Sequence, residues 1–282
     1  MEGNDAAQQA NPDTLETMLR MAHSFGNWDH LISLADSLHD IAINSFHGAK
    51  PKHWKQQKPP IYYLGFSSLM KGIALKKKKQ YAEALTYIEK YRDLSLFADG
   101  SEKESLIVDK FAFYAKANSY SLHILSGDHR QLYDYASFLK QHPAEALPGL
   151  ISILEGANTH DFQVDEVIAP LLETLYHTIH DDIPPEKHPY YFYPLYLLSV
   201  YYFKNRRYDK AIDNVIQQME FSDKINDHLH FKKAVALFEE CRGQASPIQL
   251  ESYQRILKNY LMQFLLNEEG FSLDFRIAEN TS

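Results

Sequence analysis

Two segments of this chain repeat one spacing of small, aromatic and apolar residues, and this repeat limits the possible folds more than any other feature. The first segment, GIALKKKKQYAEALTYIEKYRDL, begins at Gly72, and the second, SVYYFKNRRYDKAIDNVIQQMEF, begins at Ser199. In both, a tyrosine follows the small residue by nine positions and an alanine follows it by twelve. Small residues let two helices approach closely while an aromatic ring fills the space between them. The spacing therefore predicts that each segment is a tightly packed helical hairpin.

Helical periodicity extends over most of the remaining chain. Apolar residues recur at helical spacing, short polar or Gly/Pro breaks separate the runs, and no run alternates apolar and polar residues as a strand does. We expect Gly156 to end one helix and Pro170 to kink or break the next. The prediction is an all-α chain: a flexible segment over residues 1–13, one elongated domain over 14–269 and a C-terminal tail over 270–282.

The spacing of small residue, aromatic residue, tyrosine and alanine resembles the tetratricopeptide repeat, a helix-turn-helix unit of ~34 residues. YAEALTYIEKYRDL is similar to the second helix of that repeat. GNWDHLISLADSLHDIA and SGDHRQLYDYASFL resemble the repeat more loosely, with Leu31 and Leu132 in the place of its alanine. The resemblance implies a solenoid of helical hairpins, wound as a right-handed superhelix, whose first helices line a concave groove. The alternative is an irregular helical bundle in which two hairpins are alike by chance.

Composition restricts the partners and the compartment. The chain has 29 Lys+Arg and 37 Asp+Glu, and this net charge of −8 argues against direct binding of nucleic acid through a broad basic surface. Cys241 is the one cysteine, which excludes an intrachain disulfide and fits a reducing cytoplasm. The first residues lack the pattern of a signal peptide, and no apolar run approaches the ~18 residues of a membrane span. We expect a cytoplasmic protein without a membrane partner.

The sequence carries no motif that announces catalysis or a cofactor. The phosphate loop GxxxxGK[ST], the dinucleotide motif GxGxxG, the nucleophile elbow GxSxG and the zinc motif HExxH are all absent. His177, His180 and two aspartates form HTIHDD at an expected helix end, where the helix dipole by itself favours histidine. Acidic neighbours should raise the pKa of the Cys241 thiol, which is the wrong direction for a nucleophile. We therefore predict no enzyme, no cofactor and no metal.

The lysine run Lys76–Lys79 is the strongest local charge feature. We interpret it as a solvated turn between the two helices of a hairpin, with a docking patch for an acidic partner as the alternative.

Asn118 is the leading candidate for a peptide-binding residue, because it lies within an expected helix where an asparagine has no capping role. Its amide offers a donor and an acceptor together, which matches the unpaired N–H and C=O groups of an extended peptide. Tyr114 and Ser121 lie on the same stripe of that helix. In the later hairpin, the residues expected to line the groove are Tyr193, Tyr196, Val200, Phe203 and Lys204. The alternatives are a structural hydrogen bond for Asn118 and core packing for the aromatic residues.

The GNWDHLISLAD-like and SGDHRQLYDYASFL-like hairpins also resemble those of the peptide-sensing regulators of Gram-positive bacteria, of the Rap, NprR, PlcR and PrgX type. In that group a short signalling peptide binds the groove, and asparagines on the first helices hold its backbone. The resemblance therefore implies this role for Asn118. Some members carry an N-terminal DNA-binding domain, whereas here only a short polar segment precedes the first expected helix. This chain is then either an adaptor of the Rap type or the sensor part of a longer regulator.

The function hypothesis is a cytoplasmic sensor for quorum-sensing peptides, acting on transcription directly or through a partner protein, and able to form a homodimer. The alternative is a constitutive scaffold that binds a segment of a partner protein.

Overall fold

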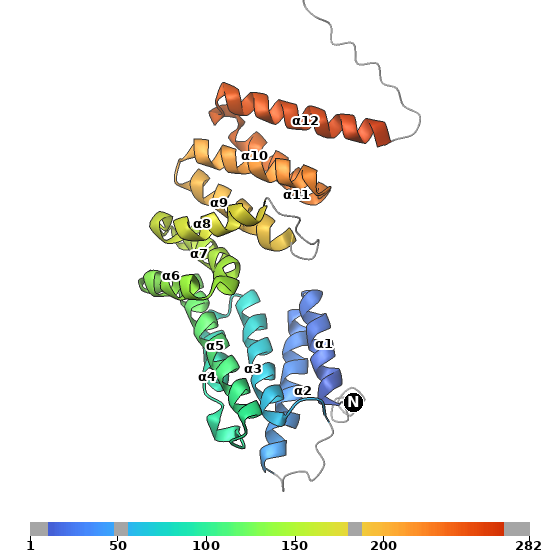
Figure 1. The fold of residues 1–282 in the computed structure, drawn as a ribbon, viewed down its shortest axis with the longest axis vertical. Coiled ribbons are helices and arrows are strands. Elements are labelled where there is room, and N and C mark those ends of the chain that lie inside the picture. The colour runs from blue at the N-terminus through green and yellow to red at the C-terminus, as the bar shows by residue number, and fades with distance from the viewer. Residues whose placement is uncertain (1–10, 48–55, 180–187, 268–282) are drawn as a thin grey trace, which may run out of the picture. The chain divides into compact units, whose positions relative to one another are not determined.

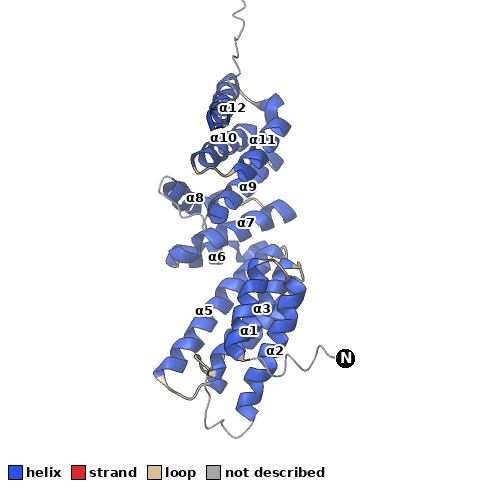
Figure 2. Cartoon of the chain, turned by 90° about the vertical axis from the view of Figure 1, so that its right-hand side faces the viewer, coloured by secondary structure: helices blue, strands red, loops and turns tan. Residues whose placement is uncertain are grey.

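The chain folds into helices. A computed structural model describes residues 11–47, 56–179 and 188–267, and these residues contain twelve α-helices, short 3-10 turns and no strand (Figure 2). The predicted all-α class is confirmed. The helices are α1 (Pro12–Ser24), α2 (Trp28–His47), α3 (Pro60–Lys77), α4 (Tyr81–Arg92), α5 (Glu102–Leu125), α6 (Leu132–Gln141), α7 (Ala146–His160), α8 (Asp165–Ile179), α9 (His188–Lys204), α10 (Tyr208–Lys224), α11 (His228–Cys241) and α12 (Pro247–Asn267) (Figure 1).

The helices form two compact units, Met1–Glu145 and Ala146–Ser282. The domain expected from the sequence over residues 14–269 stays a prediction. In the first unit, α1 to α5 each pack against the next helix, and α3 also contacts α1 and α5 (Figure 1). The core of this unit is apolar and fully enclosed, with Leu19, Leu31, Leu38, Ile88 and Phe111 each at most 2% exposed.

The second unit repeats the packing of successive helices. Helix α10 contacts α9, α11 and α12, and α7 contacts α9. Its core includes Ile212, Val215, Met219 and Phe238, and the ring of Phe238 stacks on that of Tyr253 at 3.8 Å. The expected tail over 270–282 and most of the expected flexible segment over 1–13 lie outside the described residues.

Five helix ends form the same turn. In each, one residue takes a left-handed φ between 56° and 100°, and the N–H that follows it donates to the carbonyl five positions earlier at 2.9 Å. These are the features of the Schellman motif. The left-handed residues are Gly26, Lys79, Gly127, Arg206 and Asn226. Lys79 and Arg206 occupy the same place in the two repeated segments, so these segments share a turn as well as a spacing.

The small residues of the repeat lie where the two helices of the hairpin meet. A Cβ atom added to Gly72 would lie 3.8 Å from the carbonyl oxygen of Ala84 and 3.7 Å from Cβ of Tyr87. In the second hairpin, Ser199 and Ala211 are each 1% exposed. The expected close approach is therefore found in the first hairpin, and the matching positions are buried in the second.

Two helix boundaries differ from expectation. Helix α7 continues through Gly156, which is buried, and ends at His160. Helix α8 runs from Asp165 to Ile179 with Pro170 inside it, so the predicted break does not occur. Burial of an apolar face can outweigh the propensity of a single residue, and this explains why neither residue ends its helix.

Candidate functional site

A cavity of about 440 Å³ lies between α9 and α11 in the second unit. Its walls are mostly aromatic and aliphatic, with three ionisable side chains from α11. The lining residues are Phe192, Tyr193, Tyr196, His230, Lys233, Ala236, Leu237 and Glu240. Size and composition match those of a site for a small organic ligand or a few residues of a peptide.

Helical spacing brings these residues to one place. On α9, Tyr193 and Phe192 lie one turn before Tyr196, and on α11 the positions 230, 233, 237 and 240 fall on one face. Helix α10 contacts both helices and so fixes their separation. The cavity therefore lies between two helices that both pack against α10.

His230 is held in one orientation within the cavity wall. Its ring stacks on Phe192, with centroids 4.4 Å apart and planes 8° from parallel. Asp227 caps the start of α11: its carboxylate accepts from the backbone N–H of His230 at 3.0 Å and lies 2.8 Å from Nδ1 of the same residue. Burial raises the pKa of Asp227, but the hydrogen bonds and charge of His230 and the hydrogen bond from the backbone of Leu229 together lower it by more. The imidazole is thus fixed by a ring on one side and a carboxylate at Nδ1.

Two of the residues predicted from the sequence line this cavity. Tyr193 is 40% exposed and Tyr196 is 37% exposed, so both rings are accessible from solvent. The hydroxyl of Tyr193 donates to Oε1 of Glu155 at 2.7 Å, and both burial and this carboxylate raise the pKa of Tyr193. The tyrosine is therefore anchored at its polar end, while its exposed ring contributes to the cavity wall.

The other three predicted residues of this unit do not line the cavity. Phe203 packs against the apolar core, with its ring 5.6 Å from that of Tyr208. Nζ of Lys204 donates to the carbonyl of Asn158 and to Oδ1 of Asp161, both at 2.6 Å. These contacts fasten the end of α9 to the end of α7. Val200, one turn before Lys204 on α9, also lies outside the set that lines the cavity.

The three predicted residues on α5 belong to the first unit. Nδ2 of Asn118 donates to the hydroxyl of Tyr91 at 3.2 Å, and Tyr91 is 1% exposed. Ser121 is buried, and its hydroxyl accepts from Nζ of Lys76 at 3.2 Å. The ring of Tyr114 lies edge-on to Phe111 at 6.2 Å. Asn118 and Ser121 thus contact other helices of their own unit, Tyr114 contacts Phe111 of its own helix, and none of the three lines the cavity between α9 and α11.

A second cavity of about 390 Å³ lies along α5. It is lined by Arg92, Ala112, Lys116, Ser119, Tyr120, His123 and Gln131. Its cations already have partners: Arg92 pairs with Glu89 at 2.6 Å, His123 lies 3.8 Å from Asp128, and Lys116 lies over the ring of Phe138. It is therefore less suited to a charged ligand than the cavity between α9 and α11.

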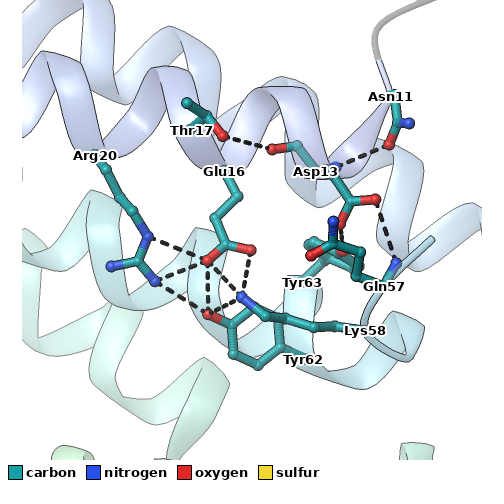
Figure 3. A network of polar contacts seen from close by, with 9 residues as sticks. All are labelled: Asn11, Asp13, Glu16, Thr17, Arg20, Gln57, Lys58, Tyr62 and Tyr63. Carbon is teal, nitrogen blue, oxygen red and sulfur yellow. Dashed lines mark hydrogen bonds and ion pairs between the residues drawn. The ribbon is translucent and has the colours of Figure 1, made fainter.

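An ionic cluster around one buried carboxylate joins α1 to the start of α3 (Figure 3). Glu16, 7% exposed, accepts from Lys58 at 2.6 and 2.7 Å, from Arg20 at 2.7 Å and from the hydroxyl of Tyr62 at 3.0 Å. Beside it, Asp13 accepts from the backbone N–H of Gln57 at 3.2 Å. Both oxygens of Glu16 are occupied, so the cluster serves to hold the helices together.

Metal and thiol chemistry find little support in the described part of the chain. It contains no group of three His, Cys, Asp or Glu side chains that could hold an ion. His177 lies on α8, whereas His180 and the two aspartates after it lie outside the described ranges. Burial first, and then the charge of Glu240, raise the pKa of Cys241, as predicted. None of the described helices combines the length and the apolar character needed to cross a bilayer.

Sequence reasoning missed the residues that α11 contributes. His230, Lys233, Leu237 and Glu240 belong to no recognisable motif and had not been selected as candidates. Their spacing along the helix is a usable signal, but it identifies a site only once α11 is known to lie beside α9.

Comparison with known proteins gives no relative for this chain. No known family, no curated protein and no solved structure matches it.

Proposed function

We propose that the chain is a regulatory protein that binds a short oligopeptide in the groove between α9 and α11. The cavity itself carries this proposal. Exposed aromatic rings of Tyr193 and Tyr196 face a helix whose charged side chains, Lys233 and Glu240, have no hydrogen bond or ion pair within the described residues. Aromatic walls with a few polar groups are typical of sites that accept peptide side chains.

The proposal includes a tetratricopeptide-like solenoid wound as a right-handed superhelix. The repeated Schellman turns and the two aligned hairpins support it. In such an array the first helix of each hairpin lines the concave face. Helices α9 and α11 each begin a hairpin, and the cavity lies between them. The fold proposal and the site proposal therefore support each other.

The biological setting rests on the resemblance to peptide-sensing regulators of Gram-positive bacteria. We propose a cytoplasmic protein that senses a quorum-sensing peptide and regulates transcription, directly as part of a longer regulator or as an adaptor. Peptide binding would shift the population between two arrangements of the helices and so alter a surface for a second copy or a partner. Such a shift requires that the peptide bind one arrangement more tightly than the other.

Peptide capture with a blocked groove tests the proposal. The protein is mixed with random heptapeptides, separated by size exclusion, and the retained peptides are identified by mass spectrometry. Ala236 is exposed and lines the cavity, so Ala236→Trp should fill it and abolish retention. The matched control is Ala82→Trp, at an exposed position of α4, which should retain the same peptides as the wild type. Equal retention by both variants, or no retention by the wild type, would contradict the proposal.

The same experiment separates the sensor from the scaffold. A constitutive scaffold would retain no free peptide and would bind only a folded protein or its terminal segment. A stoichiometric protein partner whose binding is insensitive to Ala236→Trp would therefore move the function away from peptide sensing.

Single substitutions decide which of the predicted residues bind the peptide. Tyr196→Ala should lower affinity about tenfold or more by removing an aromatic wall. Asn118→Ala, in contrast, removes an amide that donates to Tyr91. Unchanged affinity in Asn118→Ala would end the assignment of Asn118 to the site, and unchanged affinity in Tyr196→Ala would end that of the cavity.

A further inference from the structure

The cavity between α9 and α11 carries opposite charges at its two ends. His230 and Lys233 lie one turn apart near the start of α11, and Glu240 lies two turns beyond Lys233. All three line the cavity. Lys233 and Glu240 are exposed and have no hydrogen bond or ion pair with any side chain in the described ranges. Their charges are therefore available to a ligand.

Between these ends the wall is apolar. Phe192, Tyr196, Ala236 and Leu237 supply rings and aliphatic carbon. His230 extends this wall with one face, because its ring stacks on Phe192. Since Nδ1 is occupied by Asp227, the nitrogen of His230 that remains for a ligand is Nε2. One end thus offers the ammonium of Lys233, which suits a carboxylate, beside an imidazole whose Nε2 accepts a hydrogen bond when Nδ1 donates to Asp227.

The separation of the charges sets the spacing in the ligand. Seven residues of an α-helix span about 10 Å at ~1.5 Å per residue. An extended peptide advances about 3.3–3.6 Å per residue, so about three residues cover the same distance. A ligand that pairs with both ends would carry its own charges three positions apart, with apolar side chains between them.

We infer that the groove selects peptides in which an acidic and a basic side chain, three positions apart, enclose apolar residues. This inference rests on the proposed function and adds the class of peptide. The acidic side chain meets Lys233, the basic side chain meets Glu240, and the apolar residues contact Tyr196 and Leu237. Each pair is solvent-accessible before binding, so each should change affinity by about threefold to tenfold.

Three capped tetrapeptides test the charge pattern. They are acetyl-Glu-Phe-Leu-Lys-amide, acetyl-Lys-Phe-Leu-Glu-amide and the neutral acetyl-Gln-Phe-Leu-Gln-amide, and capping removes the terminal charges. In calorimetric titrations, at least one charged peptide should bind the wild type threefold to tenfold more tightly than the neutral one. The difference should shrink in 0.5 M salt, because salt screens exposed charges.

Neutralising variants locate the effect. Lys233→Gln and Glu240→Gln should each reduce binding of the charged peptide towards that of the neutral peptide and leave the neutral peptide unaffected. The matched controls are Lys232→Gln and Glu251→Gln, at exposed positions outside the cavity lining. They should leave the affinity for the charged peptide and for the neutral peptide unchanged.

The outcomes are distinct from those of the capture experiment. Equal binding of the neutral and charged peptides, equal effects of the cavity and control variants, or no binding of any tetrapeptide would overturn the inferred charge pattern. The random heptapeptides carry no assumption about charge, so their retention still decides the proposed function when the charge pattern fails.

Discussion

Glu16 is a single buried carboxylate that fastens α1 to the start of α3. Burial raises its pKa, but the hydrogen bonds from Lys58, Arg20 and Tyr62 lower it by more in total. Its stabilising effect is therefore complete above its ordinary pKa of 4.5 and is lost as the pH falls through the lower pKa of the folded state. The residue contributes most near neutral pH.

Glu16→Gln should reduce the free energy of unfolding by about 1–3 kcal/mol at pH 7, because the amide leaves two cations without a carboxylate. The measurement is urea unfolding of wild type and variant at pH 7 and at pH 4, and the difference should narrow at the lower pH. Glu83→Gln, at an exposed position of α4, serves as the control and should change little. A variant as stable as the wild type at pH 7 would show that the cluster is dispensable.

Gly65 has no side chain, and this allows the ring of Phe111 to pack closely against the backbone of α3. A Cβ atom at this position would lie 2.6 Å from the ring of Phe111, which is 2% exposed and has no room to move outward. Overpacking of this kind costs about 1–3 kcal/mol, and the better helix propensity of alanine recovers only about 1 kcal/mol. Gly65→Ala should therefore lower the free energy of unfolding by up to about 2 kcal/mol.

Urea unfolding of Gly65→Ala checks this prediction against Gly243→Ala, where an added Cβ would meet no atom within 4 Å. The control should differ from the wild type by less than about 0.5 kcal/mol. Equal stability of the two variants would mean that Phe111 adapts without loss.

At the scale of elements, the left-handed position of the repeated turns is occupied by different types of residue. The left-handed position holds glycine in two turns, but Lys79 has a φ of 60° and Arg206 a φ of 58°. For a residue with a Cβ, the left-handed conformation costs about 1–2 kcal/mol of stability. This cost exceeds the free energy that glycine loses through the larger loss of backbone entropy on folding. Lys79→Gly and Arg206→Gly should each raise stability by about 0.5–1 kcal/mol.

Thermal unfolding measures this gain, and Lys77→Gly supplies the comparison. Lys77 is exposed and helical at the end of α3, so glycine there should lower stability by about 1 kcal/mol. A gain of stability in Lys79→Gly and a loss in Lys77→Gly, only two residues away, would be explained by backbone conformation alone. A loss at both positions would indicate that the Lys79 side chain contributes an interaction that outweighs its strain.

The same elements show how far the sequence could predict the molecule. Apolar periodicity located the helices. Helix α11 begins and ends where its apolar pattern begins and ends, because the periodicity and the breaks that bound it depend only on neighbouring residues. Tyr193 and Tyr196 could be selected because aromatic residues beyond the needs of a helical core stand out in the sequence. Lys233 and Glu240 could not, because only the packing of α11 beside α9 gives them a common cavity. The division into two units depends on contacts that no local pattern encodes.

At the scale of the whole molecule, each unit has its own enclosed core. The cluster around Leu31 and Phe111 lies within Met1–Glu145, and the cluster around Ile212 and Phe238 lies within Ala146–Ser282. Both tryptophans of the chain, Trp28 and Trp54, belong to the first unit by sequence. Tryptophan fluorescence should therefore report on the first unit alone, whereas far-UV circular dichroism reports on the helices of both.

Separate cores predict that the two units unfold as separate cooperative steps. Phe238→Ala removes a ring that is 0% exposed and stacked on Tyr253, and such truncations cost about 3–5 kcal/mol. In urea, this variant should move part of the circular dichroism transition to lower concentration and leave the fluorescence midpoint unchanged. Gly65→Ala should do the converse, moving the fluorescence midpoint and only part of the dichroism signal.

A peptide that binds the groove should stabilise the dichroism step that Phe238→Ala weakens, by mass action on the second unit. If both probes shift together in both variants, the units unfold as one, and a ligand bound between α9 and α11 would then stabilise the whole chain.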